Sequence, residues 1–231
     1  MSVKNKYAII IAAAGIGSRM KSDIPKQFIN VFNKPVLYYT VKAFDGFNCA
    51  DKIVITVSKP YIPYVENMIK QYEFKTQITV TEGGSTRRES VYNGILASGG
   101  DITHVLIHDA ARPLIDKQTV LKCIESLESG VCCAAGVKVK DTIKLADDSQ
   151  NIIKTVDRSN LWQIQTPQCF DKESILNAHI YAKNNNIEAT DDCMLYEMQN
   201  GKIKIIESSY NNFKITAPAD LALFKELIQN D

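Results

Sequence analysis

Apolar runs of strand length alternate with amphipathic stretches over the first part of the chain. The runs expected to form strands are residues 7–12, 52–57, 77–82, 103–108 and 131–139. The stretches expected to form helices are residues 35–44, 63–72, 86–97 and 117–128. The early runs are continuously apolar, which is typical of strands buried on both faces. The pattern therefore predicts an α/β fold: a mostly parallel, twisted sheet with helices on both faces and a site beyond the carboxyl ends of its strands.

The pattern changes at Val137. There VKVKDTIKL alternates apolar with polar residues, ADDSQN supplies turn residues, and IIKTVDR resumes the alternation. This predicts a β-hairpin over residues 137–158. A hairpin alone is marginally stable in water, so it has to pack on another surface. A second subunit is the natural candidate, which predicts a dimer; the alternative is that the hairpin folds back on its own sheet. Further helices are expected over residues 172–183, 191–198 and 218–228, and short strands over 202–207 and 211–216.

The composition is that of an ordinary globular protein. The chain has 231 residues, of which 45% are hydrophobic, and a net charge of +1. We expect a single domain over residues 1–231. The near-zero charge argues against a nucleic-acid partner, because such proteins are usually strongly basic. No apolar run approaches the ~20 residues that span a bilayer, and the first one is too short for a signal peptide. We therefore expect a cytoplasmic protein with no membrane partner.

The cysteines and histidines show no metal-ligand spacing. None of the six cysteines belongs to a C-x-x-C pair, and Cys132 and Cys133 are adjacent, so on a strand they point to opposite faces. We expect reduced thiols buried as small hydrophobes, and no zinc site.

The loop after the first strand, AAAGIGSRMKSDIPKQF, resembles phosphate-binding loops. Gly15 and Gly17 fit the start of the dinucleotide pattern G-x-G-x-x-G, but Met20 stands where that pattern needs a small residue. The Walker pattern is absent. Arg19 and Lys26 add two cations to the loop, which suits a triphosphate under attack better than a dinucleotide. The alternative is a solvated loop with incidental charges.

A second segment, HDAARP, ends the fourth expected strand. Asp109 stands where a carboxylate can hold Mg²⁺ beside phosphate oxygens. Arg112 could clamp a second anion. The alternative is that Asp109 caps the next turn and pairs with Arg112.

A third segment, EGGSTRRES, follows the third expected strand. Its two glycines permit close approach of the backbone to a flat base, and Ser85 or Ser90 could bond the edge of that base. The alternative is an ordinary glycine turn with a serine helix cap.

These segments together resemble one family. AAAGIGSRM with PKQF, then EGGSTRRES, HDAARP, VKDT, TVDRSNLWQIQTPQ and FKITAPADL occur in the order found in the 2-C-methyl-D-erythritol 4-phosphate cytidylyltransferase family. The resemblance implies a Rossmann-like nucleotidyltransferase fold and a homodimer made through a protruding β-arm, which matches residues 137–158. It implies Mg²⁺ and direct in-line attack by a sugar-alcohol phosphate on the α-phosphorus of CTP, with release of pyrophosphate.

The resemblance also implies roles for single residues. The implied catalytic residues are Arg19, Lys26, Arg158, which reaches into the partner's site, and Lys214. The residues implied to contact CTP are Ala13, Ala14, Gly15, Gly84, Ser85, Ser90 and Ala110. Arg112, Thr142 and Thr166 are implied around the acceptor phosphate, and Asp109 as the Mg²⁺ ligand. Two positions depart from the family pattern: Ser85 replaces a residue that is usually acidic, and Asp192 a glutamate.

Three other functions were weighed against this one. Ribitol-5-phosphate cytidylyltransferases share the fold and the chemistry, but HDAARP and VDRSNLW favour the isoprenoid family. A regulatory module without chemistry would be expected to lack Arg19, Lys26 or Asp109. A dehydrogenase is disfavoured by Met20. The leaving pyrophosphate needs no acid, so we expect His108 to be structural.

Overall fold

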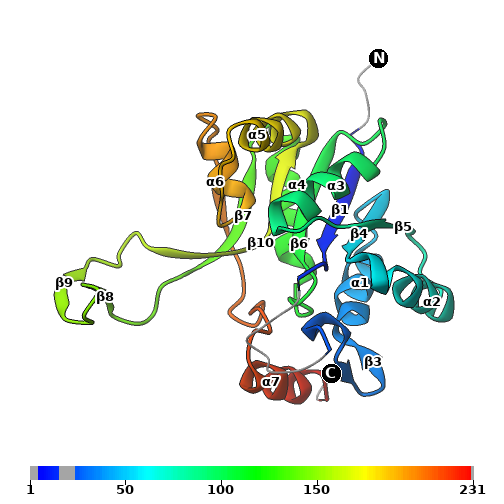
Figure 1. Cartoon of the computed structure of the whole chain (residues 1–231), viewed down its shortest axis with the longest axis horizontal. Helices are drawn as coiled ribbons and strands as arrows, with labels where there is room; N and C mark the ends of the chain where they lie inside the picture. Colours follow the sequence, from blue (N-terminus) through cyan, green and yellow to red (C-terminus); the bar gives the residue numbers. More distant parts are fainter. Residues whose placement is uncertain (1–4, 16–23, 230–231) are drawn as a thin grey trace.

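A seven-stranded sheet forms the centre of the protein (Figure 1). The computed structural model describes residues 5–15 and 24–229. The strands, in spatial order, are β11 (Lys204–Glu207), β7 (Cys133–Lys138), β10 (Trp162–Asp171), β6 (His104–Asp109), β1 (Tyr7–Ala12), β4 (Lys52–Val57) and β5 (Gln77–Glu82). All neighbours pair in parallel except β10, which runs antiparallel to both β6 and β7. The prediction of a mostly parallel sheet is confirmed.

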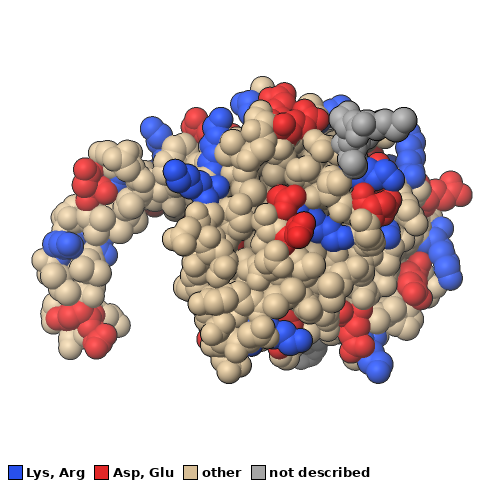
Figure 2. All heavy atoms as spheres, turned by 90° about the horizontal axis from the view of Figure 1, so that it is seen from above, with Lys and Arg blue, Asp and Glu red and all other residues tan. Residues whose placement is uncertain are grey.

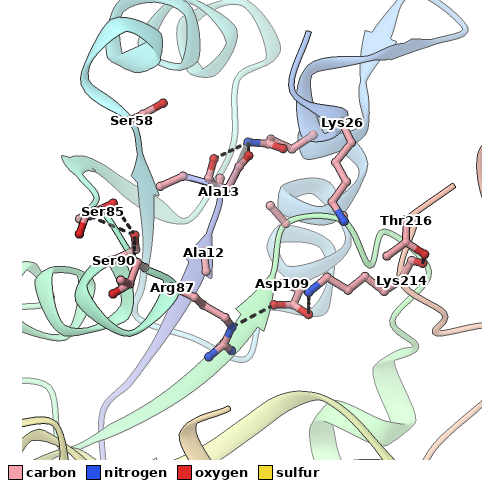
Figure 3. A pocket seen from close by; sticks show the side chains of 17 residues that line it. Ala12, Ala13, Lys26, Ser58, Ser85, Arg87, Ser90, Asp109, Lys214 and Thr216 are labelled. Carbon is pink, nitrogen blue, oxygen red and sulfur yellow. Dashed lines mark hydrogen bonds and ion pairs between the residues drawn. The ribbon is translucent and has the colours of Figure 1, made fainter. Parts of the chain in front are cut away.

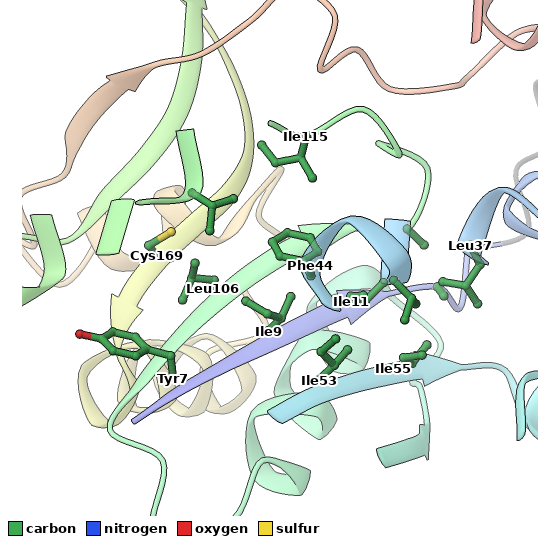
Figure 4. Close-up of a cluster of buried hydrophobic side chains, with 14 of the residues drawn as sticks. Tyr7, Ile9, Ile11, Leu37, Phe44, Ile53, Ile55, Leu106, Ile115 and Cys169 are labelled. Atoms are coloured by element: carbon green, nitrogen blue, oxygen red, sulfur yellow. The ribbon is translucent and has the colours of Figure 1, made fainter. Parts of the chain in front are cut away.

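Helices cover both faces of this sheet, as predicted. Helices α1 (Val36–Phe47), α2 (Ile62–Tyr72) and α4 (Lys117–Glu128) pack on one face, and α3 (Arg87–Ala97), α5 (Lys172–Asn184) and α6 (Asp192–Glu197) on the other. Along β1, Ile9 and Ile11 belong to the first cluster, and Ala8 and Ile10 to the second. Successive side chains of a strand point to opposite faces, so one continuous apolar run supplies both cores. Figure 4 shows the first of these clusters, where Phe44 of α1 covers the isoleucines.

A smaller layer lies beyond the carboxyl ends of the strands. It contains the short hairpin of β2 (Asn30–Val31) and β3 (Lys34–Pro35), the 3-10 turns 26–28 and 59–61, and α7 (Pro218–Gln229). Phe224 of α7 is fully buried against Val31, Val36 and Ile215. This layer brings the segment 214–216 beside the turn 26–28, where Lys26 Nζ donates to the carbonyl of Ile215.

Two strand predictions need correction. The strand expected over residues 211–216 is wrong, because this segment joins no sheet, although the Ile215 N–H donates to the carbonyl of Ala111 at 2.8 Å. Strand β10 is missing from the predictions, since its polar Gln165 and Gln168 interrupt the apolar run. Both side chains are buried. The interior tolerates them because their amides are bonded; Gln168 Oε1, for example, accepts from the backbone N–H of Asp192 at 3.0 Å.

The predicted hairpin stands away from the body as an arm (Figures 1 and 2). Strands β8 (Ile143–Ala146) and β9 (Ile152–Val156) pair only with each other. The arm therefore does not fold back on its own sheet. Its apolar side chains face water: Ile152 is 65% exposed and Ile153 60%. Such exposure is unusual for large aliphatic side chains that lie next to each other.

The root of the arm is braced against the segment that follows β11. The Tyr210 hydroxyl donates to the carbonyl of Lys138 at 2.7 Å, and Lys140 Nζ lies 3.3 Å from the centre of the Tyr210 ring.

Of the helices in residues 5–15 and 24–229, none has the length and apolar character that a membrane crossing requires.

Candidate active site

A cavity of about 650 Å³ opens at the carboxyl ends of the parallel strands (Figure 3). Its walls are the first residues after β1, β4, β5 and β6, joined by the turn 26–28 and the segment 214–216. The lining residues are Ala12, Ala13, Ala14, Gly15, Lys26, Gln27, Ser58, Gly84, Ser85, Thr86, Arg87, Ser90, Asp109, Ala110, Ala111, Lys214 and Thr216. Parallel strands bring these distant segments together because all of them end at one edge of the sheet.

Gln27, to which the sequence analysis assigns no role, bonds to the first residues of the phosphate loop. The Gln27 amide nitrogen donates to the carbonyls of Ala13 at 2.6 Å and Gly15 at 2.9 Å, and its side chain is buried. The loop after β1 is thus tied to the turn 26–28. This turn aims Lys26 into the cavity, where its Nζ donates to the carbonyl of Ile215 at 2.7 Å. Gln27 lies within the segment PKQF that the sequence analysis singled out, but no local pattern there indicates these two hydrogen bonds. Arg19 lies outside the described residues.

Asp109 is the centre of a compact charge cluster. Its Oδ2 lies 2.9 Å from Lys214 Nζ and 3.4 Å from Arg112 Nε, and its Oδ1 lies 3.4 Å from Arg87 Nε. Burial alone would raise the pKa of Asp109, but the positive charges of Lys214, Arg87 and Arg112 lower it well below the usual value. The carboxylate stays ionised, and the three cations around it outnumber the two carboxylates, Asp109 and Asp192, with which they pair. The excess positive charge favours polyanionic ligands.

Arg87 is the functional residue that sequence reasoning missed. It begins α3, and its Nη1 lies 2.7 Å from Oδ2 of Asp192. The other oxygen of Asp192 lies 3.1 Å from Nε2 of His179, and both of these side chains are buried. Burial acts to raise the pKa of Asp192, but the charge of Arg87 and the bond to His179 lower it overall. A chain of polar contacts therefore runs from the buried His179 through Asp192 and the partly exposed Arg87 to Asp109.

The glycine segment after β5 forms a tight corner. The Gly84 N–H donates to Ser90 Oγ at 3.0 Å, and the Ser85 hydroxyl donates to Glu89 Oε2 at 2.6 Å. A Cβ at position 84 would lie only 2.1 Å from Glu89 Cβ, so glycine is required there. The helix cap that follows is Thr86, which accepts from the Glu89 N–H at 3.1 Å. The expected serine cap is wrong, because Thr86 caps the helix. Gly84 lies on the cavity wall, and its contact with a base stays a prediction.

The predicted acceptor residues, together with the predicted catalytic residue Arg158, fall into two groups. Arg112 and Thr166 lie directly beside Asp109: the Asp109 N–H donates to Thr166 Oγ1 at 3.1 Å. Thr142 and Arg158 lie in the arm, away from this cavity, and are exposed. Within one chain, the structure does not bring these two residues to the site.

His108 lies beneath the cavity, outside its lining. It is fully buried, its Nε2 lies 3.0 Å from the carbonyl of Arg112, and its Nδ1 lies 3.0 Å from Thr166 Oγ1. Burial lowers the pKa of His108 to about 4. The neutral imidazole, held by a hydrogen bond at each ring nitrogen, supports the backbone that carries Asp109 and Arg112.

The donor set is suited to a hard divalent cation. Asp109 is the only carboxylate among the described residues that line the cavity. Mg²⁺ is typically held in proteins by one or two carboxylates, waters and the phosphate oxygens of the substrate. The Lys214 ammonium already places a positive charge 2.9 Å from Asp109 Oδ2, so this oxygen faces a position where a cation is favoured.

Comparisons with known proteins agree on one family. A family model described as 2-C-methyl-D-erythritol 4-phosphate cytidylyltransferase matches residues 7–230. Proteins of that name from Clostridium novyi and Alkaliphilus oremlandii are 43% and 42% identical over 227 residues. The alignments cover 98% of both chains in the first case, and 97% of this chain and 96% of the relative in the second. A solved structure of 4-diphosphocytidyl-2C-methyl-D-erythritol synthase from Anaerococcus prevotii superposes with a TM-score of 0.85 at 28% identity, covering 97% of this chain and 99% of that one.

Proposed function

The chain belongs to the 2-C-methyl-D-erythritol 4-phosphate cytidylyltransferase family, and from this premise we propose how its cavity carries out the reaction. The enzyme transfers the cytidylyl group of CTP to 2-C-methyl-D-erythritol 4-phosphate, giving 4-diphosphocytidyl-2-C-methyl-D-erythritol and pyrophosphate in isoprenoid biosynthesis. The observation that best supports the mechanism is the cluster of Lys214, Arg87 and Arg112 around Asp109, at the carboxyl ends of the parallel strands.

The central task of this site is to bring two polyanions together. A phosphate oxygen of the acceptor attacks the α-phosphorus of CTP, and the bond from that phosphorus to the bridging oxygen of the pyrophosphate breaks. Pyrophosphate is a stable leaving group, so no acid is required, and the reaction needs no covalent enzyme intermediate. Lys26 and Lys214 reach the cavity on the same side, where Lys26 Nζ donates to the carbonyl of Ile215. With Arg19, they neutralise the triphosphate as negative charge moves onto the leaving group.

Mg²⁺ is the proposed cofactor, held by Asp109 together with phosphate oxygens of CTP. When bound, it would neutralise charge on the triphosphate and fix its geometry. Lys214 and Arg87 would then exchange part of their contact with Asp109 for contacts to phosphate oxygens. Lys214 is well placed for this change because its side chain is 34% exposed.

We assign the glycine corner to the nucleoside. Gly84, Ser85 and Ser90 line the cavity on the side of Ala14, to which the neighbouring Gly83 packs closely. Gly84 leaves the backbone accessible to a flat base there. Ala13, Ala14 and Gly15 present backbone to the nucleotide phosphates, and Ala110 lies where a ribose would pass between base and metal. The Ser85 hydroxyl is engaged by Glu89, so we expect its backbone to contact the base.

We further propose that the arm builds a homodimer and completes the partner's acceptor site. The exposed Ile152 and Ile153 supply an apolar surface for a second copy. Thr142 and Arg158 are displayed on the same projection, away from their own cavity. The acceptor phosphate would be held by Arg112 and Thr166 of one chain and by Thr142 and Arg158 of the other.

We also propose that the protein is located in the cytoplasm, as the sequence predicts.

The reaction is tested by product analysis. The purified enzyme is given CTP and Mg²⁺ with either 2-C-methyl-D-erythritol 4-phosphate or ribitol 5-phosphate, and products are identified by mass spectrometry. We expect rapid formation of the cytidine diphosphate product from the first acceptor and little from the second. Preference for ribitol 5-phosphate would overturn the acceptor assignment. Full activity in the absence of any divalent ion would overturn the role of Asp109.

Sharing of the site is tested by mixing inactive variants. Arg158→Ala and Lys26→Ala each damage a different part of the site, so a mixed dimer assembles one intact site from the undamaged halves. We expect activity to return on mixing, after subunit exchange has been verified by differently tagged chains. Complete exchange without any recovery would show that each chain uses its own Arg158.

A further inference from the structure

Three cysteines from different elements meet in the core. Cys123 lies on α4, Cys133 begins β7 and Cys169 lies on β10, and all three are fully buried. Their Sγ atoms lie within 4.8 Å of one another. Cys133 and Cys169 are direct partners in the antiparallel β7–β10 ladder, and the Cys133 thiol donates to the carbonyl of Cys123 at 3.6 Å. The ladder and the helix packing fix this spacing, so no loop has to order for the sulfurs to converge.

We propose that Cys123, Cys133 and Cys169 form a binding site for a trivalent thiophilic ion, of which arsenite is the simplest source. This site is separate from the substrate cavity, since Cys133 stands at the start of β7 and the cavity lies at the carboxyl ends of the parallel strands.

The geometry matches three-coordinate sulfur ligation. Bonds from sulfur to such an ion are ~2.3 Å long, as in zinc thiolates, and trivalent arsenic keeps a lone pair and is pyramidal, so its three sulfurs lie roughly 3.5 Å apart. The three Sγ atoms, which lie within 4.8 Å of one another, would draw closer on binding. Thiolates are soft ligands and select soft ions over Mg²⁺ or Ca²⁺. Within the described part of the chain, this cluster contains no histidine or carboxylate to complete a four-coordinate zinc site.

Charge selects the trivalent ion among the soft ones. In the reaction As(OH)₃ + 3 Cys–SH → As(S–Cys)₃ + 3 H₂O, three As–S bonds replace three As–O bonds. Each thiol proton leaves on a hydroxide as water, and no oxidation occurs. The adduct is neutral, whereas Cu(I) on three thiolates carries two negative charges and a divalent ion carries one. An uncompensated charge in an apolar core is costly, so the neutral adduct fits this interior best.

A second hollow lies near these thiols, although none of the three cysteines lines it. Its volume is about 340 Å³, and it lies between α4 and β11 with Ser126, Lys204 and Ile206 among its walls. Ile206 belongs to the same buried cluster as the three cysteines, and Lys204 is the ladder partner of Cys133. A small neutral hydroxide such as As(OH)₃ would need only a local displacement of α4 from the sheet edge to reach Cys133.

The test is arsenite binding by the full chain under reducing conditions with a monothiol. After removal of free arsenite, we expect one arsenic atom per chain, three sulfur neighbours and no oxygen by X-ray absorption, and a raised unfolding midpoint. Cys123→Ala, Cys133→Ala and Cys169→Ala should each lose tight binding. Cys132→Ala is the matched control: it is a buried neighbour on the opposite face of the sheet, and it should bind like the wild type.

A second variant covers the case in which the core substitutions unfold the chain. Cys49→Ala/Cys132→Ala/Cys193→Ala leaves only the three proposed ligands and should still bind one arsenic through three sulfurs. Loss of binding in this variant would overturn the proposal. So would an oxygen atom in the arsenic shell, or equal binding by wild type and a folded Cys133→Ala.

Discussion

Replacing Asp192 by asparagine tests the chain of polar contacts from His179 to Asp109 most directly. Asp192 Oδ2 lies 2.7 Å from Arg87 Nη1 and its Oδ1 lies 3.1 Å from His179 Nε2, and its side chain is 1% exposed. A hydrogen bond to a charged group contributes about 1.5–3 kcal/mol, and breaking a buried pair costs about 3–5 kcal/mol. The amide keeps its shape and one acceptor, and Arg87 keeps its contact with Asp109. We therefore expect a loss of about 3 kcal/mol.

For a chain of this size, ~1 kcal/mol shifts the melting temperature by about 2–4 °C. Asp192→Asn should thus melt about 6–12 °C below the wild type, measured by calorimetry and by urea unfolding. Asp191→Asn is the matched control, because it removes the same charge one residue away. Asp191 caps α6 by accepting from the Met194 N–H at 2.9 Å, and asparagine caps a helix about as well as aspartate. Its other oxygen accepts from Gln168 Nε2 at 2.9 Å, so we expect the control to lose only about 1 kcal/mol.

The pH dependence gives an independent check. The folded-state pKa of Asp192 is lowered, so its stabilisation is fully present above the pKa of an unfolded aspartate, ~3.9. It is lost as pH falls through the folded-state value. The stability difference between wild type and Asp192→Asn should therefore be constant near neutrality and shrink in acid. A difference within about 0.5 kcal/mol of that for Asp191→Asn, or one that grows in acid, would refute the role of this carboxylate.

Three other predictions follow from the cavity and the arm. Lys26→Ala should lower kcat by about 10²–10³, as for other groups that stabilise transition-state charge, while CTP binding by calorimetry weakens less than tenfold; equal losses would contradict that role. Gly84→Ala should reduce stability by about 1–3 kcal/mol, because the new Cβ meets Glu89 at 2.1 Å. Gly46→Ala has open space on helix α1 and should be neutral or stabilising in the same unfolding assay. Ile152→Asp should shift sedimentation from dimer to monomer, and an unchanged dimer would exclude this surface from the interface.

The strand pattern was readable because burial on both faces leaves a local signature. Residues 52–57 and 77–82 coincide with β4 and β5, and residues 117–128 with α4. Strand β10 left no such signature. Its buried glutamines are tolerated only because Asp191, Asp192 and Cys193, far along the chain, bond to Gln168. Whether a strand can bury a polar residue depends on contacts made in the tertiary structure, which hydrophobic periodicity does not reveal.

The candidate site divides in the same way. Segments at the carboxyl ends of parallel strands must meet, so Gly15, Gly84 and Asp109 could be placed at one edge from their order in the sequence. Nothing local indicates that Gln27 ties the phosphate loop to its neighbour, or that Arg87 bridges Asp109 and Asp192. These bonds join residues that are 14, 22 and 105 positions apart.

The sequence alone determined the layers of this protein, the edge at which its chemistry lies and the type of ligand that edge attracts. Hydrophobic period and charged residue type act over a few neighbouring positions, so both can be read along the chain. Only the tertiary structure decided which cations contact Asp109, that the arm turns away from its own cavity, and that three cysteines converge in the core. Those outcomes depend on distances between segments, which are set when the sheet and its covering helices pack.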